Sequence, residues 1–224
     1  MHPLDNPVLA ALRGGNARFG EGAGSVLRFQ PDVAPFVGMP TDPGPADWRA
    51  VAALAGPGGV CVTAGVDGAP PEGWEVLDDL PGVQLVDDGV VGAPDPEAVT
   101  LGPADVPEML DLVARTRPGP FLPRTVQLGR YLGVRRDGAL VAMAGERMRP
   151  PGWAEVSAVC TDPAHRGQGL STRLVRAVVA GMRERGERPF LHAVATNTGA
   201  VRLYGSLGFT LRREIPFRSV RVPA

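Results

Sequence analysis

The spacing of hydrophobic and polar residues along this chain predicts an alternation of strands and helices. From residue 170 to 182, apolar side chains recur at intervals of three and four, the period of a helix with one buried face. Short apolar runs bounded by turn-forming residues are typical of strands. The expected strands are 24–29, 59–64, 98–101, 131–136, 139–147, 153–161 and 189–195, with two weaker ones near 74–77 and 83–86. The other expected helices are 46–55, 103–115 and a segment that begins near residue 197.

The strongest local turn signal is Asp137-Gly138, which separates the expected strands 131–136 and 139–147. Both residue types tolerate the positive φ angles that a two-residue hairpin loop requires. After residue 97, the expected order is strand, helices, hairpin, strand, helix, strand, helix and strand. This order indicates an α/β fold.

The segment 87–97 concentrates acidic residues, Gly and Pro, so it is the best linker candidate. A linker there divides the chain into an N-terminal lobe, 1–96, and a second domain, 97–224. At 224 residues the chain is long enough for one large or two small domains. The first lobe carries no clear motif, and we expect a smaller α/β unit that covers one side of the second domain.

The composition is that of an ordinary globular protein, with 44% hydrophobic residues and a net charge of −1. No apolar run approaches the twenty residues of a membrane span, and the N-terminus lacks the pattern of a secretory signal. We therefore expect a cytoplasmic protein that does not bind a membrane. Cys61 and Cys160 are the two cysteines, and neither lies in a cluster with zinc spacing, so no metal is expected.

Charge is distributed unevenly along the chain. Residues 1–100 carry 14 acidic residues and 4 Arg, a net charge of −10, whereas 101–224 carry 10 acidic residues and 19 Arg, a net charge of +9. A basic half suits a ligand that carries several phosphates, or it can dock against the acidic half. The Arg residues are scattered and aromatic residues make up 5% of the chain, which argues against a nucleic-acid partner.

The segment 159–172 is the most informative stretch of the sequence. A short strand runs into a Gly-rich turn, and this turn opens directly onto the amphipathic helix. The first turn of such a helix presents unpaired N–H groups and the positive end of the helix dipole, which together bind phosphate. A Walker loop is excluded because the chain contains no Lys, and a dinucleotide fingerprint is excluded because Thr172 stands where a third Gly is needed.

Two motifs carry a resemblance to a known family. The segment Arg166-Gly167-Gln168-Gly169 resembles the pyrophosphate-binding motif of the GCN5-related N-acetyltransferases, the GNAT superfamily. About thirty residues later, the segment 197–209 resembles the second block of that superfamily, Asn-x-x-Ala-x-x-x-Tyr-x-x-x-Gly-Phe. The likeness covers about 98–220 and is closest to the FR47-like branch. Ser171 departs from the usual Gly or Ala, although Ser is small enough to fit.

The resemblance implies the acyl-CoA N-acyltransferase fold, a mixed and mostly antiparallel sheet flanked by helices. It also leaves an extra N-terminal α/β lobe, which could be a degenerate copy of the same fold. The implied cosubstrate is acetyl-CoA, with its pantetheine arm beside the strand before the phosphate loop and its pyrophosphate on the loop amides. The residues that the resemblance assigns to this cofactor are Val159, Cys160, Thr161, Arg166, Gly167, Gln168, Gly169, Leu170, Ser171, Thr172 and Asn197.

Three residues carry the expected chemistry. In the family pattern, Tyr204 matches the tyrosine that protonates the departing thiolate. Glu155 matches a glutamate that serves as general base in some members, and His192 stands where other members have a Glu. A His with an unperturbed pKa of ~6.5 is a credible base near neutral pH, although a His in an apolar strand is more often a packed residue. Ordered water is a further candidate for the base.

The sequence therefore predicts an N-acetyltransferase that moves the acetyl group of acetyl-CoA to a primary amine by direct attack in a ternary complex. The acceptor is a small molecule, an amino acid or a peptide, and a homodimer is one arrangement left open. Transfer of a longer acyl group and a non-catalytic acyl-CoA-binding module are the alternatives. Specificity is expected to reside in 116–130, in the hairpin and in the N-terminal lobe, with Arg124 and Arg147 as candidates to hold an acidic acceptor.

Overall fold

The computed structural model describes residues 2–224 of the chain. These residues form a single eleven-stranded sheet with helices packed on it. The strand order is β1-β2-β3-β4-β11-β5-β10-β9-β8-β7-β6, and only the β3–β4 and β9–β10 pairs are parallel. The strands are β1 (Gly20–Ala23), β2 (Val26–Phe29), β3 (Phe36–Gly38), β4 (Val60–Ala64), β5 (Glu75–Asp87), β6 (Val99–Leu101), β7 (Tyr131–Arg136), β8 (Ala139–Glu146), β9 (Trp153–Thr161), β10 (Arg188–Val194) and β11 (Phe209–Arg221). The α-helices are α1 (Pro7–Leu12), α2 (Pro45–Ala55), α3 (Val106–Thr116), α4 (Leu170–Glu184) and α5 (Thr198–Leu207).

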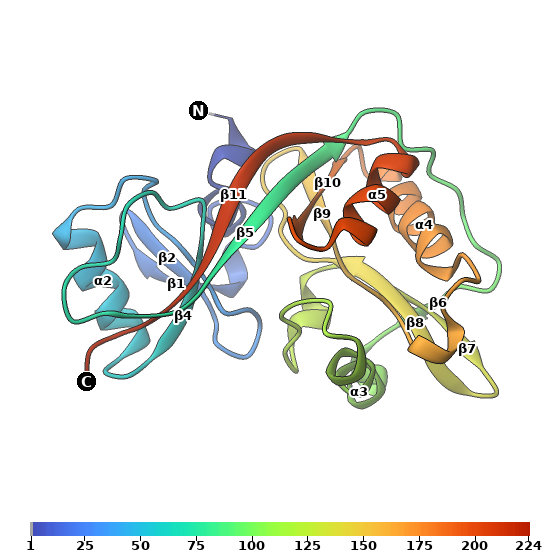
Figure 1. The fold of residues 1–224 in the computed structure, drawn as a ribbon, viewed down its shortest axis with the longest axis horizontal. Coiled ribbons are helices and arrows are strands. Elements are labelled where there is room, and N and C mark those ends of the chain that lie inside the picture. The colour runs from blue at the N-terminus through green and yellow to red at the C-terminus, as the bar shows by residue number, and fades with distance from the viewer. Residues whose placement is uncertain (1) are drawn as a thin grey trace.

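Two long strands, β5 and β11, join the two ends of the molecule (Figure 1). They pair with each other over nearly their whole length; β11 also pairs with β4, and β5 also pairs with β10. The prediction of two short strands near 74–77 and 83–86 was wrong, because one strand continues through Pro81. Pro81 lies directly opposite Pro216, so the two residues without an N–H share one position of the ladder.

The sheet crosses the predicted boundary between 1–96 and 97–224. Strand β5 precedes that boundary, yet it lies between β10 and β11, which both follow it. The division into two lobes therefore stays a prediction about folding units that share one sheet. The same holds for the idea that the first lobe is a degenerate copy of the second.

Several other predicted elements are confirmed. Strand β9 has the predicted bounds, and β7 and β8 form the predicted hairpin. Asp137 has φ 50° and Gly138 φ 83°, as a two-residue hairpin loop requires. In the N-terminal lobe, α1, β1 and β3 had no sequence signal, because they are only three to six residues long.

Helices cover both faces of the second half of the sheet (Figure 1). Helix α4 packs its apolar face onto β8 and β9, and each fully buried aliphatic side chain there contributes about 1.5–3 kcal/mol. Helix α3 covers the opposite face of the same strands. Residues Leu4, Val8 and Leu12, at the N-terminus, close a further core with Trp153 and Phe190 of the second half.

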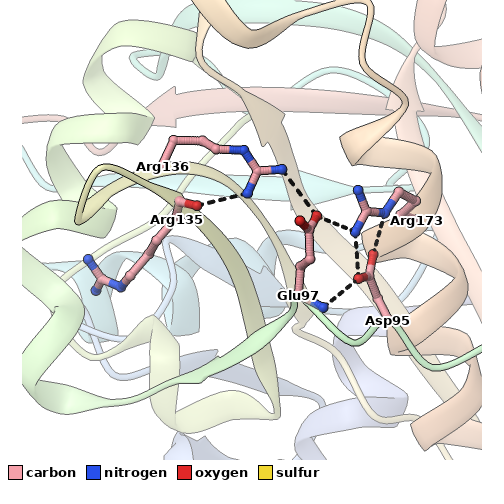
Figure 2. A network of polar contacts seen from close by, with 5 residues as sticks. All are labelled: Asp95, Glu97, Arg135, Arg136 and Arg173. Atoms are coloured by element: carbon pink, nitrogen blue, oxygen red, sulfur yellow. Dashed lines mark hydrogen bonds and ion pairs between the residues drawn. The ribbon is translucent and has the colours of Figure 1, made fainter.

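Ion pairs explain much of the charge asymmetry. Within residues 2–224, eight pairs join an acidic residue of the first hundred to an Arg of 101–224, so the basic half docks against the acidic half. Two acidic residues of the predicted linker, Asp95 and Glu97, accept hydrogen bonds from Arg173 of α4 at 2.6 Å and 2.5 Å. Glu97 also accepts from Arg136 of β7 at 3.1 Å (Figure 2). These contacts hold the segment after β5 against α4.

Candidate active site

Strands β9 and β10 pair only over the first part of their length. Their parallel register runs from Trp153 opposite Arg188 to Val156 opposite Leu191, although β9 continues to Thr161. The register of β9 with β8 shifts next to Ala158, whose φ is 52°, in the left-handed region that alanine rarely adopts. This bulge turns β9 away from β10, and leaves the edge of 157–161 without a strand partner on that side among the described residues.

A cavity of about 200 Å³ lies where β9 meets α4. Its lining residues are Thr161, His165, Arg166, Gly167, Gly169, Leu170, Ser171, Thr172 and Leu203. Gly167 and Gly169 have φ angles of 78° and 71°, so the turn uses the left-handed backbone region that glycine adopts without strain. Within the described residues no side chain caps α4, so its first N–H groups face this cavity without a side-chain partner. We call it the phosphate-side cavity.

Ser171, the departure from the family pattern, has a structural role here. Its hydroxyl lies 2.9 Å from the hydroxyl of Thr161 and so ties the end of β9 to the first turn of α4. Arg166 contacts the Thr161 carbonyl through Nε at 3.4 Å and lines the cavity. The structure thus brings together seven of the predicted cofactor residues, and their contact with a cofactor stays a prediction.

Tyr204 lies on α5, buried against Phe209. Burial, together with the charge that Cys160 would carry as a thiolate, raises the pKa of the Tyr204 phenol to about 12. The phenol therefore keeps its proton at neutral pH, as a proton donor must. The Asn197 carboxamide oxygen caps α5 by accepting the Ala200 N–H at 3.1 Å, so this side chain already has a structural partner.

Glu155 is fully buried and fully engaged. Arg147 donates to it from Nε at 2.9 Å and from Nη2 at 2.7 Å, and His192 Nδ1 lies 2.7 Å from Oε1. Burial favours the neutral acid, but the charge and hydrogen bonds of Arg147, followed by those of His192, hold the pKa of Glu155 well below its usual range. Glu155 is therefore a poor receiver of a proton, and its geometry is that of a group that orients His192.

The other ring nitrogen of His192 contacts a residue that sequence reasoning missed. Gln84 Nε2 lies 3.0 Å from His192 Nε2 and also donates to the Leu4 carbonyl at 3.0 Å, while Gln84 Oε1 accepts from Arg212 at 2.8 Å. Since the Glu155 carboxylate can only accept, His192 carries its proton on Nδ1 and accepts from Gln84 at Nε2. No local motif marks Gln84, because β5 reaches β10 only in the folded sheet.

A second cavity, of about 190 Å³, opens beside His192 and is walled by both halves of the chain. Its lining residues are Phe36, Val62, Leu80, Pro118, Gly119, Pro120, Arg147, His192, Ala193, Val194, Phe217 and Ser219. The loop after α3 and the N-terminal lobe, where we expected specificity to reside, both contribute to it. We call it the inter-lobe cavity. Arg124 lines neither cavity and donates to Asp32 and Gln30 instead.

Similarity to known proteins decides the family. The model of the family described as FR47-like protein matches residues 131–218, from β7 into β11. Over its full length the chain is 42% identical to a protein from Novosphingobium aromaticivorans whose crystal structure is assigned to the GNAT family of acetyltransferases; the match covers 100% of both chains with a TM-score of 0.92. This chain belongs to the GNAT family.

Two curated relatives of this GNAT protein match it over shorter segments. It is 49% identical over 57 residues to a mycothiol acetyltransferase of Thermobispora bispora, and 38% identical over 82 residues to the N-alpha-acetyltransferase RimI of Mycobacterium tuberculosis. The segments cover 25% and 35% of this chain, but only 19% and 51% of these relatives. The relatives support acetyl transfer in general, and the predicted family, fold and class of enzyme are confirmed.

Within residues 2–224 of the GNAT chain, none of the helices is long and apolar enough to cross a membrane. In the same range, no group of three His, Cys, Asp or Glu residues has the arrangement of a metal site.

Proposed function

We propose that this protein transfers the acetyl group of acetyl-CoA to a primary amine by direct attack within a ternary complex. The observation that carries the proposal is the alignment of three features along β9. The phosphate-side cavity lies at its end, the edge without a strand partner follows, and the inter-lobe cavity with His192 lies beyond. A long, thin cofactor and a separate small acceptor match this sequence of features.

The phosphate-side cavity would hold the diphosphate of acetyl-CoA on the amides of Gly167 to Thr172, because helix N-termini bind phosphate. Arg166 lies at the same place and adds a positive charge. Val159, Cys160 and Thr161 offer the backbone edge that β10 leaves unpaired, where the arm of the cofactor can pair as an extra strand. Bound there, the cofactor supplies an acetyl thioester.

Amides of β9 near the bulge would polarise the thioester carbonyl, as preorganised N–H donors do in acyl transfer. Tyr204 would then give its proton to the departing sulfur. Tyr204 can do so because it stays protonated at neutral pH, with a pKa of about 12. The Tyr204 hydroxyl must lie within hydrogen-bond reach of that sulfur.

The proton of the amine would pass to His192, directly or through water. Glu155, which already accepts the Nδ1 hydrogen, would stabilise the resulting imidazolium. To reach Nε2 the amine must replace the Gln84 amide at that atom. In this scheme His192 is the base and Glu155 is its positioning residue; the direct use of Glu155 as base is the less favoured variant.

The test is amine-dependent release of free thiol from acetyl-CoA, followed across a panel of primary amines. We expect H192N to lower kcat/KM by about 100-fold or more, the usual contribution of a general base, while the affinity for CoA in calorimetry is unchanged. Tight CoA binding with no thiol release for any amine would contradict the enzyme and favour an acyl-CoA-binding module. Faster release from longer acyl-CoA would favour the other alternative.

A further inference from the structure

The inter-lobe cavity has a composition that limits what it can bind. Its walls are mostly apolar: Phe36 and Val62 come from the N-terminal lobe, and Leu80 and Phe217 from the two long strands. Its lining contains no Asp or Glu, so a second ammonium group on an acceptor finds no carboxylate partner there. At about 190 Å³ the cavity is also smaller than the pockets that enclose drug-sized ligands. These features favour a small acceptor with one amine and an apolar group.

Arg147 is the one cation in this lining, and its guanidinium is held in a fixed plane. Two of its nitrogens, Nε and Nη2, are bound to Glu155, and the ring of Phe36 lies 4.8 Å from its central carbon. The third nitrogen, Nη1, has no partner among residues 2–224. It is also not fully buried, because Tyr131 Oη is the one fully buried polar side-chain atom without a partner in that range. Arg147 therefore presents a rigid, unused N–H donor at the cavity wall.

The position of this donor relative to His192 matters. Arg147 Nη2 and His192 Nδ1 both bind the same oxygen, Glu155 Oε1, at 2.7 Å each, so the two side chains lie beside each other, and both line the cavity. A small acceptor that carries an amine and an oxygen can therefore contact both side chains. Because Glu155 already balances the charge of Arg147, the donor suits a neutral carbonyl as well as a carboxylate.

We propose that the inter-lobe cavity accepts an α-amino acid, or its amide, that has an apolar side chain. Its oxygen accepts a hydrogen bond from Arg147 Nη1, and its side chain packs against Phe36, Val62 and Phe217. The N-terminal lobe thus acts as a specificity wall for the acceptor. This inference rests on the proposed acetyl transfer, because it assigns the amine of the acceptor to His192.

The experiment compares four amines as acceptors for the wild-type protein: leucinamide, leucine, isoamylamine and putrescine. Isoamylamine is leucine without its carboxyl group, so the comparison isolates the oxygen. A hydrogen bond to a charged donor predicts that leucinamide or leucine exceeds isoamylamine in kcat/KM by roughly 10- to 100-fold. The ratio of leucine to leucinamide separates a carboxylate from a carbonyl acceptor. Putrescine is expected to be the poorest of the four.

Two variants test whether the preference for an acceptor with an oxygen depends on Arg147, and neither leaves Glu155 buried without a cation beside it. R147K keeps a positive charge beside Glu155 but lacks the planar fork, so the preference for oxygen should fall to within roughly threefold. The loss should be several-fold larger for leucinamide than for isoamylamine, whereas a merely structural role would lower both rates by the same factor. R124K is the matched control, because Arg124 pairs with Asp32 outside the cavity; its preference should equal that of the wild type.

The outcomes separate this inference from the proposed function. Equal rates for leucinamide and isoamylamine, with robust thiol release from both, would overturn the role of Arg147 and leave acetyl transfer standing. A leucine-initiated tetrapeptide that exceeds leucinamide by more than about tenfold would overturn the small-acceptor assignment. Thiol release from none of the amines, in a protein that still binds CoA, would remove the proposed function and this inference with it.

Discussion

The two cavities of this protein differ in how the chain builds them. The phosphate-side cavity comes from the segment 161–172, with Leu203 as the one distant contribution. The inter-lobe cavity draws on residues from Phe36 to Ser219, in both halves of the chain. The first combines the backbone N–H groups at the start of α4 with the Arg166 side chain, whereas the second is lined by side chains from several distant elements. Backbone amides at a helix N-terminus bind the same group whatever the neighbouring side chains are, so the first cavity suits a constant cofactor and the second a variable acceptor.

Tyr204 is the proposed proton donor, and the loss of its hydroxyl is the largest expected effect on the reaction. Y204F should lower kcat by roughly 100-fold or more, since general acid catalysis contributes about that much, with little change in CoA affinity. Y131F is the matched control, because Tyr131 is the other of the two tyrosines and is also buried. Equal losses in both variants would show that Tyr204 acts only through packing.

The buried ion pair of the inter-lobe cavity should dominate stability. E155A leaves the Arg147 charge buried and unpaired, which costs about 3–5 kcal/mol. D32A breaks an exposed pair with Arg124 and should cost about 1 kcal/mol or less. Urea unfolding of both variants checks the contrast. Similar losses of unfolding free energy in E155A and D32A would contradict the prediction that the buried pair of Glu155 and Arg147 stabilises the fold more than an exposed pair does.

The buried Tyr204 predicts that the stability of the protein depends on pH, and Y131F leaves Tyr204 as the one remaining tyrosine. Burial raises the pKa of Tyr204 to about 12, above the unfolded value of ~10. Because the folded pKa is the higher one, this contribution to stability is complete below pH ~10 and is lost as pH rises toward the folded pKa. Spectroscopic titration of the folded Y131F variant should therefore detect tyrosinate only near pH 12. Titration near pH 10 in the folded state would contradict the burial of Tyr204.

The smallest effect concerns the glycines of the phosphate-side cavity. G169A places a side chain at φ 71°, which costs about 1–2 kcal/mol, although the added Cβ meets no atom within 4 Å. G186A, at φ 74° beyond the end of α4, carries the same strain away from the cavity. Both should lose similar stability in thermal unfolding, but only G169A should raise the KM for acetyl-CoA. A raised KM in both variants would contradict the role of the phosphate-side loop.

Sequence patterns predicted the parts of the fold that depend on neighbours in the chain. The bounds of β9, the Asp137-Gly138 turn and the helix after Gly169 follow from local preferences and from the period of apolar residues. The short N-terminal elements and the continuous β5 did not, because their stability comes from distant partners: α1 packs on β2 and β3, and β5 is enclosed by β10 and β11. The small size of Ser171 predicts only that it fits the turn, whereas its hydrogen bond to Thr161 is seen only in the folded chain.

By itself, the sequence determined the family and the phosphate-side cavity, because both depend on residues close together in the chain, whose spacing is fixed by helix and turn geometry. Only the tertiary structure decided which groups surround His192. From the sequence, Glu155, His192 and ordered water are all candidate bases, and the fold makes Glu155 a buried partner of Arg147 and His192. Gln84 and Phe36 reach the same place from the N-terminal lobe. Hydrogen bonds and packing between segments over a hundred residues apart leave no periodic signal in either segment, so the acceptor site is a property of the folded sheet.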